Sequence, residues 1–284
     1  MLLAVDIGNT QTVIGVFEDD DWELTNRKPG ELPGLLHHWR ISTVRDRTAD
    51  EFAIVLDQLL RSAGIALMSD ATASEIRLDG QITGVVVSSS VPTLTSAMRE
   101  MAETWFDVPF VVIGPGIRTG MPILYDNPRE VGADRIANGV AAADLFGGPA
   151  IVVDFGTSTN FDVVSAAGEY MGGAIAVGLE VSMDALFEHA AALPRIELVA
   201  PSAVIGRSTV TSMQIGAIFG HAGLVDGICR RILAELGDAT VVGTGGLVEV
   251  VAPHTEYVRV IEPWLTLHGL RVLYVRNTDD AASR

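Results

Sequence analysis

Two segments of the chain place an aspartate, a glycine and several hydroxyl groups in the same order. They read Asp6-Ile7-Gly8-Asn9-Thr10-Gln11-Thr12 and Asp154-Phe155-Gly156-Thr157-Ser158-Thr159-Asn160. A glycine lets the backbone approach a ligand closely. Hydroxyl groups and turn amides donate hydrogen bonds to phosphate oxygens, and a carboxylate holds a hydrated Mg²⁺ or another cation. Both segments are therefore predicted to bind the phosphates of a nucleotide.

The stretches on either side of each segment read as short apolar strands. Residues 2–6 and 13–17 flank the first segment, and residues 151–154 and 160–165 flank the second. The two copies begin 148 residues apart, about half of the chain, which predicts two related lobes with a nucleotide cleft between them. An ordinary hairpin turn with Asx-type hydrogen bonds would explain one copy. Two copies at equivalent positions favour the phosphate-binding interpretation.

A third glycine cluster, Gly243-Thr244-Gly245-Gly246, follows the predicted strand 240–243 and precedes a helical run at 247–251. A glycine turn before a helix suits a contact with adenosine or phosphate at the helix N-terminus. A plain loop explains this cluster equally well. It is not a Walker A loop, because no Gly-Lys-Ser/Thr follows.

An adjacent acid and base, Asp134 and Arg135, stand early in a predicted helix that spans residues 130–145. Arg135 could clamp a substrate carboxylate through two parallel hydrogen bonds. Asp134 could accept the proton of an attacking hydroxyl group. A local surface ion pair near the helix start is the alternative. Three other carboxylates near glycine turns are read as structural or solvated, namely Asp162, Glu180 and Asp184.

The remaining pattern alternates strands with helices, which predicts an α/β fold. Thr48 and Glu51 form a capping box at the start of one helix. Further strands are expected at 39–42, 84–90, 110–113 and 169–175, and further helices at 93–106, 180–190, 212–236 and 266–275. Residues 18–38 are expected to form a long loop, and a short polar tail follows the last helix. Gly114-Pro115-Gly116 is the predicted hinge between lobes at 1–116 and 117–284.

Composition limits the partners of the protein. The net charge of −17 over 284 residues opposes binding to nucleic acid or to an anionic membrane surface. It also opposes ATP, so a nucleotide site needs local backbone amides or cations. One cysteine, Cys229, excludes an intrachain disulfide and reads as a buried side chain. Neither a signal peptide nor a membrane-spanning run is predicted, and a cytoplasmic location is expected.

Several motifs together resemble the type III pantothenate kinases, a family within the acetate and sugar kinase/Hsp70/actin superfamily. The resemblance covers nearly the whole chain. Besides the two hairpin segments, it rests on the following stretches: residues 126–135 (DNPREVGADR), 168–173 (GEYMGG), 244–246 (TGG) and 265–271 (LTLHGLR). The fold that it implies has two actin-like (ribonuclease H-like) lobes with mixed sheets and a nucleotide cleft between them.

The resemblance implies ATP-dependent phosphorylation of pantothenate to 4′-phosphopantothenate, the first step of coenzyme A biosynthesis. Asp134 would be the general base, Asp6 would lie near Mg²⁺, and Asp154 would bind a monovalent cation (K⁺ or NH₄⁺). ATP would contact Asp6, Ile7, Gly8, Asn9, Thr10, Gln11, Thr12, Val13 and Thr157. Pantothenate would contact Tyr125, Gly132, Ala133, Asp134 and Arg135, and Thr209 would reach it across a homodimer interface.

The chain departs from the usual family pattern at several positions. Val177 precedes Gly178 where proline is usual, and Ser208 stands where asparagine is usual. Gln11, Asn160 and Ile215 also differ from the common residues, and the segment 21–38 is longer than in many members. Two alternatives therefore stay open: a catalytically impaired binding or regulatory relative on the same fold, and a kinase of another small alcohol.

Overall fold

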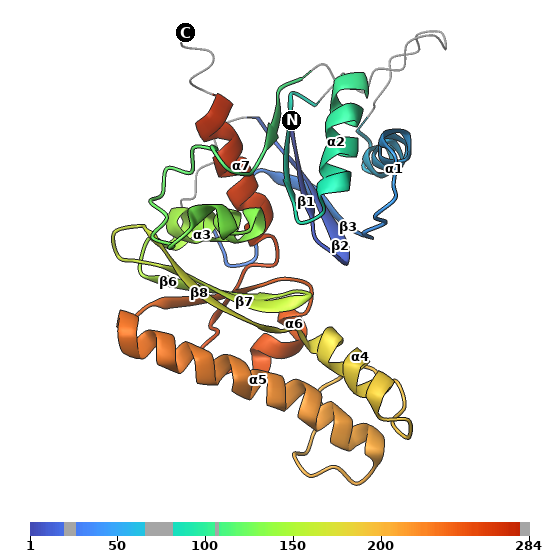
Figure 1. Cartoon of the computed structure of the whole chain (residues 1–284), viewed down its shortest axis with the longest axis vertical. Coiled ribbons are helices and arrows are strands. Elements are labelled where there is room, and N and C mark those ends of the chain that lie inside the picture. The colour runs from blue at the N-terminus through green and yellow to red at the C-terminus, as the bar shows by residue number, and fades with distance from the viewer. Residues whose placement is uncertain (20–26, 66–81, 106–107, 279–284) are drawn as a thin grey trace.

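A computed structural model describes residues 1–19, 27–65, 82–105 and 108–278, and shows two five-stranded mixed sheets separated by helices (Figure 1). The strands of the first sheet are β1 (Leu2–Ile7), β2 (Gln11–Phe17), β3 (Leu35–Ser42), β4 (Gly84–Ser89) and β5 (Phe110–Val112). Those of the second sheet are β6 (Ala150–Phe155), β7 (Ser158–Val164), β8 (Tyr170–Val177), β9 (Thr240–Thr244) and β10 (Val260–Ile261).

The two sheets share one topology. The first has the order β3-β2-β1-β4-β5, and the second, read from its other edge, has the order β8-β7-β6-β9-β10. In each sheet the central strand is antiparallel to the next strand in sequence and parallel to a later one. The predicted α/β class and the predicted duplication are confirmed by this match of strand order and direction.

The two hairpins differ by one residue. Ile7 pairs with Thr12 across the first turn, whereas Phe155 pairs with Thr159 across the second. The direct residue-by-residue match made from the sequence is therefore wrong by one position beyond the turn. Thr12 and Thr159 are the equivalent residues, and both side chains are buried. Local sequence similarity could not reveal this shift, because register depends on cross-strand hydrogen bonding.

Helices divide the molecule into layers. The helices α1 (Ala49–Ser62) and α2 (Pro92–Trp105) cover one face of the first sheet, and α3 (Ala133–Phe146) and α7 (Leu265–Thr278) lie between the two sheets (Figure 1). The outer face of the second sheet packs against α4 (Leu179–His189), α5 (Thr209–Leu236) and the short α6 (Val248–Val251). Four apolar clusters fill the spaces between these layers.

The predicted capping box is present at the start of α1. The Thr48 hydroxyl accepts a hydrogen bond from the Glu51 amide, and the Glu51 carboxylate accepts one from the Thr48 amide at 2.8 Å. This reciprocal pair satisfies two amides that have no partner within the helix. The buried residues that follow include Phe52 and Leu56, which face the first sheet.

Several element boundaries differ from the predictions, and three starting points matter here. β3 begins at Leu35 rather than at residue 39, because its ladder with β2 extends to the pair Phe17 and Leu35. α3 begins at Ala133, after a separate 3₁₀ turn at Pro128–Glu130. α5 begins at Thr209, where Ser208 caps the helix through the Thr211 amide. The part of the predicted 18–38 loop at 20–26 and the polar tail at 279–284 lie outside the described residues.

The last described helix returns to the first sheet. Leu267 and Leu270 of α7 belong to the same apolar cluster as Leu2 and Ala4 of β1.

The division of the chain near residue 116 stays a prediction. Cys229 is fully buried in α5, as expected. None of the helices within the described ranges is long and apolar enough to cross a bilayer.

Candidate active site

The two hairpins meet at a cleft between the lobes. The hydroxyl oxygens of Thr10 and Thr157 lie 2.9 Å apart across it. The cleft has a volume of about 280 Å³ and is lined by residues from both hairpins, from α3 and from the third glycine cluster. The sequence-predicted residues that the structure brings together here are Asp6, Gly8, Asn9, Thr10, Gln11, Val13, Asp134, Asp154 and Thr157.

Asp6 lies near the end of β1, at the floor of the first hairpin. Ser88, its parallel neighbour on β4, donates a short hydrogen bond to Asp6 Oδ1. Burial and, to a smaller extent, the charge of Asp134 raise the pKa of Asp6 to about 7, against the opposing effects of the Ser88 hydrogen bond and Arg40. A cation at this carboxylate would favour its charged form.

Asp154 occupies the equivalent position near the end of β6. The Asn138 side chain on α3 donates to Asp154 Oδ2 at 3.2 Å, and Thr266 donates to the Asn138 oxygen at 2.8 Å. Burial raises the pKa of Asp154 to about 7, with added contributions from Asp134, Asp162 and Asp6. The amide nitrogen of Asn138 thus faces the acid, and the Thr266 hydroxyl satisfies the amide oxygen.

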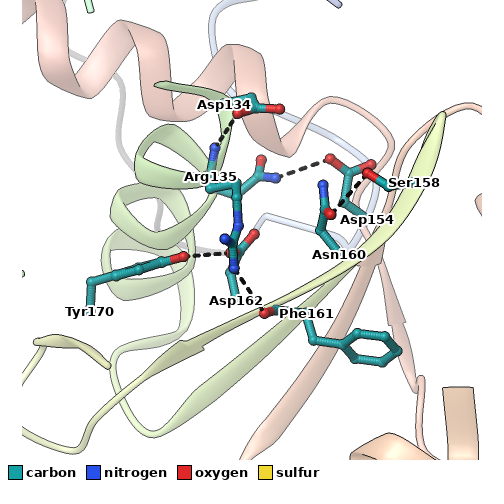
Figure 2. A network of polar contacts seen from close by, with 9 residues as sticks. Asp134, Arg135, Asp154, Ser158, Asn160, Phe161, Asp162 and Tyr170 are labelled. Carbon is teal, nitrogen blue, oxygen red and sulfur yellow. Dashed lines mark hydrogen bonds and ion pairs between the residues drawn. The ribbon is translucent and has the colours of Figure 1, made fainter. Parts of the chain in front are cut away.

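Asp134 lies in the first turn of α3 and lines the cleft together with Asp6 and Asp154. Its Oδ1 accepts a hydrogen bond from the Arg135 amide at 2.9 Å (Figure 2). Gly132 precedes it at the N-cap, and a Cβ atom built there would stand 2.5 Å from Asp134 Oδ1. Glycine at position 132 therefore leaves room for the observed orientation of the carboxylate.

Arg135 points away from the cleft into a buried polar set (Figure 2). Its Nε donates to Asp162 Oδ1 at 2.7 Å, and the Tyr170 hydroxyl donates to the same oxygen at 2.7 Å. Burial raises the pKa of Asp162 to about 6, and the Arg135 charge opposes the rise. Asp162 is fully buried, in line with its predicted structural role. Arg135 is thus committed to a partner that the sequence spacing did not suggest.

Several predicted residues lie outside the cleft lining. Ile7 and Thr12 are fully buried, and the Thr12 hydroxyl bonds to that of Thr43. Tyr125 is half-buried, and its ring lies 3.3 Å from a Cβ atom built on Gly172 of β8. Gly132 and Ala133 directly precede Asp134 at the start of α3 and do not line the cleft themselves. Thr209 lines a separate hollow of about 1050 Å³ between α4 and α5.

The third glycine cluster packs directly against the second hairpin. Gly245 has a φ of +94°, which only glycine adopts readily, and a Cβ atom there would overlap Asp154 Oδ1. Thr244, Gly245 and Gly246 all line the cleft. Of the three carboxylates predicted to be structural or solvated, Glu180 also lines the cleft, and Asp184 forms an exposed ion pair with Arg195.

Sequence reasoning missed four residues that surround the acids: Arg40, Ser88, Asn138 and Thr266. Arg40 and Ser88 come to Asp6 through cross-strand pairing, and Thr266 comes to Asn138 from a helix 128 residues away. One local signal existed for Asn138. It stands four residues after Asp134, so both side chains lie on one face of α3.

The donor set fits Mg²⁺. Asp6, Asp134 and Asp154 present hard carboxylate oxygens to one cavity, and their mutual repulsion is relieved by a bound cation. In the described part of the chain, no group of three or more His, Cys, Asp or Glu side chains forms a ready metal centre. Mg²⁺ commonly binds through one or two carboxylates, with phosphate oxygens and water completing its shell. The cleft can thus hold a Mg²⁺-nucleotide and accept a proton beside it.

Solved structures share this fold. A Baf family transcriptional activator from Campylobacter jejuni superimposes with a TM-score of 0.56 at 16% identity, over 98% of this chain and 99% of the other. A ROK family glucokinase from Streptomyces griseus, in complex with glucose and AMPPNP, gives a TM-score of 0.51 at 11% identity, over 96% and 98%. The duplicated sheets and the cleft place the protein in the actin-like fold class.

The family is defined at the sequence level. The family model of type III pantothenate kinase matches residues 2–231. A type III pantothenate kinase of Myxococcus xanthus is 50% identical over 98% of this chain and 99% of its own length. The corresponding protein of Moorella thermoacetica is 48% identical over 98% and 100%. The chain belongs to the type III pantothenate kinase family.

Proposed function

We propose that the protein transfers the γ-phosphoryl group of ATP to pantothenate and so forms 4′-phosphopantothenate, the first step of coenzyme A biosynthesis. One observation carries the proposal: a member of this family brings Asp6, Asp134 and Asp154 together in one cleft where both hairpins meet. The family implies ATP and a divalent metal ion. Nothing among the relatives favours either an inactive protein or another alcohol as substrate.

In the proposed reaction, Asp134 accepts the proton of the pantothenate hydroxyl. That oxygen attacks the γ-phosphorus, the bond to the β,γ-bridging oxygen breaks, and ADP leaves. The first hairpin, residues 6–13, and Thr157 hold the nucleotide. Asp6 holds Mg²⁺, which offsets the phosphate charge. Asp154 binds K⁺ or NH₄⁺ on the other side of the cleft.

The pantothenate side is proposed to consist of Tyr125, Gly132, Ala133, Asp134 and Arg135. The ion pair between Arg135 and Asp162 supports this assignment in an indirect way, because it anchors the first turn of α3 and so positions Asp134. We also propose that Arg135 binds the carboxylate end of pantothenate. Reaching that ligand requires a donor of Arg135 besides the Nε that binds Asp162.

We propose that Thr209 contacts pantothenate only in a homodimer. It stands at the start of α5, in the hollow between α4 and α5, and so lies away from the cleft of its own chain. In the proposed dimer, Thr209 of one protomer reaches the pantothenate held by its partner. We also propose a cytoplasmic location and a lobe division near residue 116.

The test is ADP release by the purified protein with and without pantothenate, in K⁺, NH₄⁺ and Na⁺ salts. We expect turnover that depends on pantothenate and is faster with K⁺ or NH₄⁺ than with Na⁺. Absence of pantothenate-dependent turnover in every salt contradicts the proposal. A parallel screen of hydroxy acids and sugars then identifies a different alcohol, and calorimetric binding of pantothenate without turnover identifies an impaired relative.

A further inference from the structure

The cleft has an unequal balance of charge. Among the described residues that line it, four carry carboxylates (Asp6, Asp134, Asp154 and Glu180), and Arg40 is the one with a positively charged side chain. The single lysine of the chain, Lys28, is exposed and is not part of this lining. A nucleotide polyphosphate adds several negative charges at short range, where like charges repel strongly. Metal ions offset part of this repulsion, and the protein itself supplies one cation.

Strand pairing places Arg40 beside the first hairpin. Asp6 pairs with Val13 on the neighbouring strand, and Val13 pairs with Arg40 on the next. Directly opposed residues of antiparallel strands project to the same face of a sheet. All three residues accordingly line the cleft. The position of Arg40 therefore follows from the register of the sheet rather than from a loop.

The guanidinium group of Arg40 is held by neutral contacts. Its Nη1 donates to the Gln11 side-chain oxygen at 3.0 Å, and its Cζ lies 5.6 Å from the centre of the Trp264 ring. A Cβ atom built on Gly246 would overlap the guanidinium, so this group also touches the glycine turn of the second lobe. Arg40 thus stands between the first hairpin and the second lobe.

The charge of Arg40 is not matched by an ion pair. Across the described residues, no carboxylate lies within ion-pair distance of its guanidinium. By contrast, the buried guanidinium of Arg135 is paired with Asp162 at 2.7 Å. An arginine has five N–H donors in a planar fork that matches phosphate oxygens. Arg40 uses one of them on Gln11 and keeps its charge available to an anion.

We propose that Arg40 binds the polyphosphate of the nucleotide and, through its contacts with Gln11 and Gly246, joins the two lobes around it. The proposal rests on the proposed function only in taking a nucleoside triphosphate as the phosphate donor. Binding by the planar fork would use two parallel hydrogen bonds, which a lysine cannot reproduce. Packing of β3 against Trp264 is the competing explanation, and it predicts no preference for phosphate.

The test compares ligands that differ only in their phosphates. Binding of AMPPNP, ADP and adenosine is measured by calorimetry in the presence of Mg²⁺, with wild-type protein, Arg40→Gln and Arg40→Lys. Arg61→Gln is the matched control, because Arg61 is an exposed arginine on α1 that pairs with Asp57 outside the cleft. Thermal melting of each variant reports whether the fold is retained.

We expect Arg40→Gln to weaken AMPPNP binding at least tenfold, which corresponds to about 1.4 kcal/mol. ADP binding should weaken less, adenosine binding should stay within about twofold, and Arg40→Lys should fall between Arg40→Gln and the wild type. Arg61→Gln should match the wild type. Unchanged AMPPNP affinity in Arg40→Gln overturns the proposal, and so does an equal loss for adenosine and AMPPNP, because either result leaves Arg40 a packing role only.

If Arg40→Gln does not fold, Arg40→Lys decides the matter. A selective loss of AMPPNP affinity supports the proposal, and wild-type affinity overturns it. These measurements need no pantothenate, so they remain informative if the protein phosphorylates a different alcohol. Steady-state assays add a second readout: the KM for ATP should rise in Arg40→Gln while the KM for pantothenate stays constant, and a rise in both would contradict a role at the polyphosphate.

Discussion

The two lobes share a topology but place different residues in the equivalent row across their sheets. In the first sheet the row reads Ser88, Asp6, Val13 and Arg40, and in the second it reads Thr244, Asp154, Asn160 and Ile175. The acid is common to both rows. The outer position is a cation facing the cleft in one lobe and a 66% exposed isoleucine in the other. The two lobes thus share the position of the acid and differ at the outer position of the row, where the first lobe carries a cation and the second an apolar side chain.

The two acids also differ in what holds them. Asp6 receives a hydrogen bond from Ser88 within its own sheet, whereas Asp154 receives one from Asn138 on α3, the helix that carries Asp134. The second hairpin is therefore linked to the proposed base through a helix, and the first is not. This difference predicts separate consequences when each side is altered.

The largest expected effect comes from Asp134, which belongs to neither hairpin. Asp134→Asn should lower kcat by about 10³-fold, because a positioned general base commonly contributes 10²- to 10⁴-fold. The KM for ATP should change little, since both hairpins remain intact. Steady-state kinetics measures both constants. A variant that keeps more than a tenth of wild-type kcat would remove Asp134 from the role of base.

The next effect tests the comparison directly. Asp6→Asn and Asp154→Asn should each lower kcat by about 10²-fold, on the scale of losing one electrostatic contact in a transition state. Asp6→Asn should raise the Mg²⁺ concentration needed for half-maximal rate, and Asp154→Asn should abolish the preference for K⁺ over Na⁺. Titrations of both ions on both variants measure this. If both variants instead changed the dependence on the same ion, the proposed division between a Mg²⁺ site at Asp6 and a monovalent-cation site at Asp154 would be wrong.

A smaller effect is expected from Gly132→Ala. The added Cβ atom would stand 2.5 Å from Asp134 Oδ1, so the carboxylate must turn while the helix is retained. We expect kcat to fall by about tenfold, since small displacements of reacting groups are costly, with an almost unchanged melting temperature. Gly223→Ala on α5, where a Cβ atom meets open space in this chain and which does not line the hollow that holds Thr209, is the control for adding a methyl group to a glycine. Full activity in Gly132→Ala would contradict the steric argument.

The smallest effect is on stability. Asp6 and Asp154 have a pKa of about 7 in the folded protein against 3.8 in the unfolded chain. Between these values the folded state binds more protons, so the stability of the nucleotide-free protein should fall as pH rises from about 4 to 7. Melting curves at pH 5 and pH 8 should show a smaller pH dependence in Asp6→Asn than in the wild type. Mg²⁺ should raise the melting temperature of the wild type more at pH 8 than at pH 5. An equal pH dependence of the melting temperature in the wild type and in Asp6→Asn would refute the burial of Asp6 as its cause.

Local patterns predicted much of this fold and part of the site. The hairpin segments, the Thr48 capping box and the Asp134 position were accessible because their signals lie within a few residues of sequence. The one-residue difference between the hairpins was not accessible, because register is set by pairing with a partner strand. The early start of β3 at Leu35 was missed for the same reason.

The residues that surround the acids could not be predicted from spacing. Thr266 and Asn138 are 128 residues apart, and their hydrogen bond exists only because α7 packs on α3. The ion pair of Arg135 with Asp162 on β7 was also not predicted, because residue 135 was interpreted from its neighbour in sequence. The sequence around a charged side chain at the start of a helix does not indicate which strand will pack against that helix in the folded chain.

The return of α7 to the first sheet has a consequence for the order of folding. Leu267, Leu270 and Leu273 complete an apolar cluster whose other members include Leu2 and Val86. Domains usually fold as units while the ribosome is still extending the chain. Residues of α3 such as Ile136 and Val140 belong to the same cluster, but the part of the inner face that packs on α7 stays uncovered until residues 265–273 have been made. The first sheet can therefore complete its packing only near the end of synthesis.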